Sequence, residues 1–238
     1  MKLGLLLPLL ALAALSAYAQ KSQSDGIALA IVYDTSGSMS DPVRSKAGGF
    51  SPKYVIANRA LEAIVERLGL YQSNSSAAAP RRIEAGLYTF DALSAREAVP
   101  WGPLDPTALR QWLRDFSKPL GPTPLGESLR LATGKVLSSE LPRKHVLVIT
   151  DGENTVGPAP SAVLPDLVAR SKKLGQQVSF HFVAFDVSAK LFDPLKQLGA
   201  TVLNARDEQQ LNEQLEQILG GRILLEDEEP PRVLGKRP

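Results

Sequence analysis

Cysteine is absent from the 238-residue sequence, so the fold cannot depend on disulfides or on thiolate metal ligands. Histidine occurs only twice, as His145 and His181. Both histidines lie in apolar segments that we predict to be buried strands, where they would serve the core or the sheet. A dedicated zinc site and a serine–histidine–aspartate catalytic triad are therefore disfavoured.

An excess of one charge is also missing, because 27 lysines and arginines face 25 aspartates and glutamates, a formal net charge of +2. Proteins that bind nucleic acid usually carry a clear basic surplus that neutralises phosphates. The sequence also lacks the Gly-x-x-x-x-Gly-Lys loop that holds nucleotide phosphates. Composition therefore gives no support for binding to nucleic acid or for ATP-driven chemistry.

Only one long apolar run is present, and it stands at the N-terminus. A basic start precedes apolar residues 3–15 and small residues end the segment at Ala19, which is the pattern of a signal peptide cleaved there. The run is short for a membrane span of about 20 residues, although an uncleaved anchor is the alternative. We expect residues 1–19 to be the signal peptide, residues 20–26 a linker, and the mature chain to be periplasmic or secreted. Together with the lack of cysteine, this pattern favours a bacterial periplasm.

Short apolar runs alternate with amphipathic stretches from Ile27 onward, as in proteins that connect parallel strands through helices. The runs are nearly continuous in hydrophobicity, which is typical of strands buried on both faces. The fold class predicted is α/β, with a doubly wound, mostly parallel central sheet and helices on both faces. The strongest strand candidates are residues 27–33, 146–149 and 178–185, and weaker ones are residues 83–90 and 200–203.

Helices are predicted between these strands from caps and apolar stripes. Ser51 before Pro52, and Asp105 before Pro106, match a capping residue followed by a first-turn proline. We assign every stripe to packing on the sheet and none to chemistry. The stripes lie within residues 61–68, 109–116, 125–136 and 211–219.

Polar residues suited to a hard cation follow the first buried strand. Asp34, Ser36 and Ser38 place one carboxylate and two hydroxyls on a turn, where their oxygens can converge. Thr123 precedes a predicted helix, and Asp151 directly follows another buried strand, so the fold should return both to the same sheet edge. Mg²⁺ prefers such oxygen ligands and leaves positions open for water or a partner.

Each of these residues also has an ordinary structural interpretation. Thr123 could cap the helix that starts near Pro124, and Ser36 and Ser38 could simply form a turn. Asp151 could belong to a turn with the following glycine, and Asp34 could cap the next segment. The joint occurrence of all three pieces in this order favours a metal site.

These residues resemble the metal-ion-dependent adhesion site of the von Willebrand factor type A domain family, over most of residues 27–220. The resemblance implies that Ser36 and Ser38 bind Mg²⁺ directly, with Mn²⁺ and Ca²⁺ as alternatives. It implies that Thr123 binds directly when a ligand is engaged, and that Asp34 and Asp151 bind directly or through water. The remaining position would take an acidic side chain of a partner protein.

The resemblance also implies one short antiparallel edge strand, for which residues 96–100 are the candidate. Some family members shift their last helix on binding, but this sequence contains no sign of such a switch. Residues 39–50 form a longer link after the metal loop than is usual, so they could overhang the site or form a solvated surface loop. Asp41, Glu153 and Asn154 are possible additional near-site residues, and we expect residues 221–238 to form a charged tail outside the domain.

Three functions compete at this point. The metal-dependent protein-binding domain is the one favoured, and it is not an enzyme. A metal-independent scaffold that binds through surface loops or the tail is the alternative. A metal-dependent phosphohydrolase is disfavoured, because the second aspartate that such enzymes place two residues after the first is replaced here by Ser36.

Overall fold

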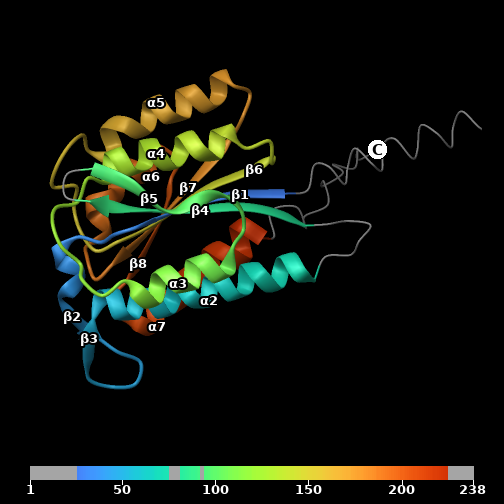
Figure 1. Cartoon of the computed structure of the whole chain (residues 1–238). Coiled ribbons are helices and arrows are strands. Elements are labelled where there is room, and N and C mark those ends of the chain that lie inside the picture. Colours follow the sequence, from blue (N-terminus) through green and yellow to red (C-terminus); the bar gives the residue numbers. More distant parts are fainter. Residues whose placement is uncertain (1–25, 75–80, 92–93, 225–238) are drawn as a thin grey trace, which may run out of the picture.

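The computed structural model describes residues 26–74, 81–91 and 94–224. The expected signal peptide, nearly all of the linker and residues 225–238 of the expected tail lie outside the described residues. The described residues form a six-stranded sheet in the order β5-β4-β1-β6-β7-β8 with helices on both faces (Figure 1). Its strands are β1 (Gly26–Tyr33), β4 (Arg82–Asp91), β5 (Ser94–Pro103), β6 (Arg143–Thr150), β7 (Val178–Phe185) and β8 (Thr201–Ala205).

The predicted fold class is confirmed. Every neighbouring pair from β4 through β8 is parallel, and only β5 runs antiparallel to its neighbour β4. All residues of β1 are buried, which explains why its sequence is apolar on both faces. The expected edge strand at residues 96–100 lies inside β5, which is longer than predicted and pairs with an irregular register.

Two helical layers cover the sheet (Figure 1). Alternate β1 residues, such as Leu29 and Ile31, pack in one cluster with α2 (Lys53–Ser73), α3 (Pro106–Asp115) and α7 (Glu208–Ile218). The residues between them, such as Ala30, pack on the other face with α4 (Leu125–Ser138), α5 (Pro160–Lys173) and the short α6 (Asp193–Gln197). The predicted stripes are confirmed as packing faces, while α5 and α6 were not predicted.

The two helix caps predicted from sequence have different outcomes. Asp105 caps α3, because its Oδ1 accepts hydrogen bonds from the backbone N–H groups of Thr107 and Ala108, both at 2.9 Å. The cap predicted at Ser51 is wrong. Ser51 pairs with Val43 in a small hairpin instead, and α2 starts at Lys53 without a side-chain cap.

The long link after the metal loop is folded. It comprises the 3-10 turn η1 (Gly37–Ser40) and the hairpin of β2 (Pro42–Arg44) and β3 (Phe50–Pro52). Glu208 at the start of α7 holds this hairpin: its Oε2 accepts from Ser45 Oγ at 2.9 Å and from the Lys46 N–H at 2.7 Å. Its Oε1 accepts from Arg59 Nε of α2 at 3.0 Å. The link is therefore fixed to two helices.

Two short helical turns complete the described chain. The 3-10 turn η2 (Ala189–Phe192) leads into α6, and the π-helical turn η3 (Leu219–Leu224) follows α7. Ile223 and Leu224 are buried, so the folded region continues past the expected boundary at Gly220. His145 and His181 are buried in β6 and β7, as predicted. Within the described residues, no helix has the length and apolar character needed to cross a bilayer.

Candidate functional site

Two aspartates meet at the carboxyl-terminal edge of the sheet because their strands are neighbours. β1 ends at Tyr33 and β6 ends at Thr150, and Tyr33 pairs with Ile149 across the parallel ladder. The next residues in the chain are Asp34 and Asp151. The backbone N–H of Asp34 donates to the Ile149 carbonyl at 3.0 Å, which ties the metal loop to β6.

Four of the predicted ligands are connected by hydrogen bonds. Asp34 Oδ1 accepts from the Ser36 N–H at 2.8 Å, which orients the turn. The hydroxyl oxygens of Ser36 and Ser38 are 3.1 Å apart, and Ser38 Oγ donates to Asp151 Oδ1 at 2.8 Å. The other oxygen of Asp34 accepts from Thr150 Oγ1 at 2.6 Å. Two hydroxyls and one carboxylate oxygen are thus brought together at one point of the edge.

The loop with Thr123 is held against both parts of this cluster. The Gly37 N–H donates to the Gly121 carbonyl at 3.1 Å, which joins the loop to the metal turn. Thr123 and Thr155 exchange two hydrogen bonds, from Thr123 N–H to Thr155 Oγ1 at 2.8 Å and from Thr155 N–H to the Thr123 carbonyl at 3.0 Å. Thr123 does not cap α4, whose N-cap is Pro124 without a side-chain bond. The capping interpretation is therefore excluded.

The additional near-site residues have different roles. Asp41 is largely exposed, and its carboxylate is 4.0 Å from the ammonium of Lys53. The side-chain oxygen of Asn154 accepts from the Gly126 N–H at 3.1 Å, so this amide holds the start of α4. Gly126 is needed there because a Cβ would collide with the Pro158 carbonyl.

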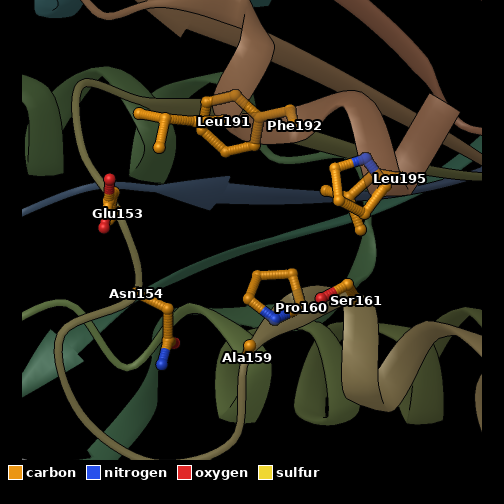
Figure 2. Close-up of a pocket in the computed structure, with 9 residues that line it drawn as sticks. Glu153, Asn154, Ala159, Pro160, Ser161, Leu191, Phe192 and Leu195 are labelled. Atoms are coloured by element: carbon orange, nitrogen blue, oxygen red, sulfur yellow. The ribbon is translucent and has the colours of Figure 1, made fainter.

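Glu153 is exposed and borders a cavity of about 170 Å³ beside the site. Figure 2 shows that one side of this cavity comes from the loop after β6 and the start of α5, and the other side from η2 and α6. The cavity places apolar side chains near the predicted metal edge. Its lining consists of Glu153, Asn154, Ala159, Pro160, Ser161, Leu191, Phe192, Pro194 and Leu195.

Lys53 is the site residue that sequence reasoning missed. It is the first residue of α2, only 5% exposed, and its ammonium lies 3.0 Å from Asp151 Oδ2 and 3.2 Å from Asp186 Oδ2. A lysine at a helix N-terminus opposes the helix dipole, so its position was a sequence sign of a specific anionic partner. Asp186 follows β7 and was also missed.

The buried carboxylates at the site favour binding of a further cation. Burial, and then the nearby charge of Asp151, raises the pKa of Asp34 to about 6. Burial alone would lower the pKa of Lys53, but hydrogen bonds and charges from Asp151 and Asp186 outweigh it and raise the pKa overall. In the described part of the chain no cation pairs with Asp34, whose oxygens accept from Ser36 and Thr150. The edge therefore holds more buried negative charge than Lys53 neutralises.

The donor set fits a hard cation. Serine and threonine hydroxyls with two carboxylates match the oxygen preference of Mg²⁺. Over the described ranges, no three acidic, histidine or cysteine side chains gather where they could hold a metal ion. The predicted set differs from such clusters because three of its five members are hydroxyls.

Comparison with known proteins identifies the family of this chain. The von Willebrand factor type A domain model matches residues 28–218. The PilB minor pilin from Streptococcus sanguinis has a similar fold, with TM-score 0.62 and 18% identity over 84% of this chain and 62% of that one. The vWF domain of the type V pili tip protein Mfa5 from Porphyromonas gingivalis gives TM-score 0.59 and 13% identity over 83% and 95% of the two chains. The pilus adhesin SpaC from Lactobacillus rhamnosus GG gives TM-score 0.59 and 12% identity over 84% of this chain and 31% of that one.

No curated protein matches in sequence. The structural likenesses are distant in sequence and support the fold alone, and this chain spans 62% of the length of the PilB pilin. The family model carries more weight, because it matches residues 28–218, which is most of the chain. The protein belongs to the von Willebrand factor type A domain family.

Proposed function

We propose that the chain is a divalent-cation-dependent protein-binding module of an exported protein. Ser36, Ser38 and Thr123 would hold Mg²⁺ together with Asp34 and Asp151, and a partner would add an acidic side chain. When bound, the ion supplies an electrophilic anchor for that carboxylate. The chain's own residues orient the ligand oxygens through hydrogen bonds.

The observation that carries this proposal is the connected set of oxygens at the sheet edge. Ser36 Oγ, Ser38 Oγ and Asp151 Oδ1 form a chain with spacings of 3.1 and 2.8 Å. Asp34 is fully buried behind them with its carboxylate fixed by hydrogen bonds. Burial of a carboxylate that lacks a cationic partner is costly, and a bound cation would offset that cost.

The comparisons favour protein association over catalysis. Similar folds occur in a minor pilin, a pilus adhesin and a pilus tip protein, which act in structures built from protein subunits. The described site also has no partner aspartate two residues after Asp34, as phosphoryl-transfer chemistry through an aspartate would need. We therefore infer a binding role in assembly or adhesion rather than an enzyme.

One observation favours the metal-independent scaffold as a second candidate. Lys53 already gives Asp151 a buried positive partner at 3.0 Å, so part of the edge is compensated without a metal. In that case binding would use surface features such as Leu120, which is 81% exposed and whose N–H donates to the Thr35 carbonyl beside the metal loop.

Calorimetric titration separates the two candidates. We expect the metal-stripped protein to bind Mg²⁺ at one saturable site. Ser38→Ala should abolish or strongly weaken that binding, whereas Ser40→Ala, in the same turn but exposed, should leave it unchanged. Circular dichroism checks that both variants fold. Equal binding by Ser38→Ala and the wild type would reject the metal site.

The acidic partner is tested with the same proteins. Immobilised peptides that contain aspartate or glutamate are compared with versions that contain asparagine or glutamine. We expect retention only of the acidic peptides, only with Mg²⁺, and not by Ser38→Ala. Retention that survives chelation would favour the scaffold.

A further inference from the structure

We propose that Lys53 is a tethered cation that shares the Asp151 carboxylate with the divalent ion and keeps the metal affinity of the site low, and that Asp186 relieves this competition. The inference rests on the metal site of the proposed function. It assigns roles to two residues that lie outside the predicted ligand set.

The competition follows from how the Asp151 carboxylate is divided. Its Oδ1 accepts from Ser38 Oγ at 2.8 Å, and its Oδ2 lies 3.0 Å from Lys53 Nζ. The Asp151 side chain is fully buried, so neither contact is shared with bulk water. The Asp151 carboxylate therefore contacts Ser38, another predicted metal ligand, through one oxygen and the Lys53 ammonium through the other. A divalent ion that draws charge from Asp151 must do so against the field of Lys53.

Lys53 is held in this position by its backbone. Its N–H donates to the Asp41 carbonyl at 2.9 Å, where the hairpin passes into α2. Its side chain is 7% exposed, which leaves the ammonium little access to solvent. An ammonium with a flexible stem is strongly hydrated in water, so burying one requires firm carboxylate partners. The lysine is thus a fixed part of the edge.

Asp186 provides the second of those partners. Its carboxylate lies 3.2 Å from Lys53 Nζ and is 40% exposed. Its backbone has φ of 52°, a left-handed conformation that non-glycine residues seldom adopt, and its N–H donates to the Ala205 carbonyl at the end of β8. The turn after β7 therefore directs this carboxylate at the lysine. Asp186 neutralises part of the ammonium charge, so Asp151 is left more available to a metal ion.

Opposite effects are expected from removing the two residues. A single charge within about 4–6 Å of a titrating group changes its equilibrium by roughly tenfold to a thousandfold. Lys53→Met keeps an apolar stem and removes the positive charge, so Mg²⁺ should bind roughly tenfold tighter or more. Asp186→Asn leaves Asp151 as the one close carboxylate of the ammonium, because the exposed Asp41 carboxylate is 4.0 Å away. Mg²⁺ should therefore bind more weakly than to the wild type.

Stability gives an independent readout. Without metal, Lys53→Met leaves Asp151 buried without a cation, so its melting temperature should fall below that of the wild type. Bound Mg²⁺ replaces the missing charge. Saturating Mg²⁺ should therefore raise the melting temperature of Lys53→Met by more than it raises that of the wild type.

The test is calorimetric titration with Mg²⁺ and thermal unfolding with and without Mg²⁺, on the wild type, Lys53→Met, Asp186→Asn and Lys118→Met. Lys118 is an exposed lysine of the loop that leads to Thr123, so its variant matches the charge change without touching Asp151. We expect tighter binding in Lys53→Met, weaker binding in Asp186→Asn and no change in Lys118→Met. If Lys53→Met fails to fold, Asp186→Asn alone decides through its predicted loss of affinity.

The outcomes distinguish this inference from the function on which it rests. Equal or weaker Mg²⁺ binding by folded Lys53→Met, while the wild type binds, overturns the role of Lys53 and leaves the metal site standing. Binding by Lys53→Met with none detectable in the wild type supports the inference in its strongest form. If neither protein binds Mg²⁺, both proposals fail.

Discussion

The buried pair of His145 and His181 should make the stability of this fold depend steeply on pH. Their rings are stacked with centroids 5.4 Å apart, and His145 Nδ1 is 3.2 Å from His181 Nε2. Burial, followed by the charges of His181 and Arg143, lowers the pKa of His145 to about 3. Burial, followed by the charge of Arg222, lowers the pKa of His181 to about 4. Both rings are therefore neutral in the folded protein under mildly acidic conditions.

The magnitude follows from the difference between the folded and unfolded pKa values. An unfolded histidine titrates near pH 6.5, so between about pH 6.5 and pH 4 the unfolded chain binds more protons than the folded one. The stabilisation is complete above pH 6.5 and is lost as the pH falls towards the folded pKa values. At pH 5 the loss is about 2 kcal/mol per histidine, or about 4 kcal/mol for the pair. The total free energy of unfolding of a typical domain is about 5–15 kcal/mol, so this loss is a large part of it.

Urea unfolding at pH 7.5 and pH 5 measures this loss. The comparison protein is the double variant His145→Leu with His181→Leu, in which the carboxylates titrate as in the wild type and cancel in the difference. We expect the wild type to lose about 4 kcal/mol more than the double variant. The single variant His181→Leu should show about half of that excess and serves if the double variant does not fold. Parallel losses in all proteins would refute the reasoning.

Two further substitutions test how the site is supported. Gly126→Ala should lower the free energy of unfolding by about 1–3 kcal/mol and weaken Mg²⁺ binding, because its Cβ would collide with the Pro158 carbonyl and shift the start of α4. Gly134→Ala is the control, since it lies in the same helix with open space around it. Equal stability of the two variants would contradict this explanation. Glu208→Gln should lower the free energy of unfolding in urea by about 2 kcal/mol, because the charge-assisted hydrogen bonds to Ser45, Lys46 and Arg59 weaken. It should also speed amide exchange in the β2–β3 hairpin. Unchanged exchange in the hairpin would show that Glu208 does not hold it.

Much of the fold could be predicted from sequence because buried parallel strands leave a strong local pattern. The continuous apolar run of β1 and the runs of β6 and β7 identified the centre of the sheet. Neighbouring strand ends then brought Asp34 and Asp151 together by geometry alone. The α5 helix was missed because prolines at its start and within it weaken the helical pattern.

The parts of the site that escaped prediction depend on contacts between distant segments. Lys53 gains its role from Asp151 and Asp186, which lie in separate loops after β6 and β7. Nothing near Lys53 in the sequence shows that those loops converge on it. The β2–β3 hairpin was also missed, since its three-residue strands are too short for an alternating pattern and depend on Glu208 of α7.

The central claim is that this sheet edge binds one divalent ion through hydroxyl and carboxylate oxygens. The most direct measurement is anomalous diffraction from crystals of the protein soaked in Mn²⁺, which substitutes for Mg²⁺ at oxygen sites. We predict a single strong anomalous peak among Ser36, Ser38 and Asp151 that is absent from crystals of Ser38→Ala. A well-ordered edge without a peak, or a peak bound elsewhere on the molecule, would contradict the account.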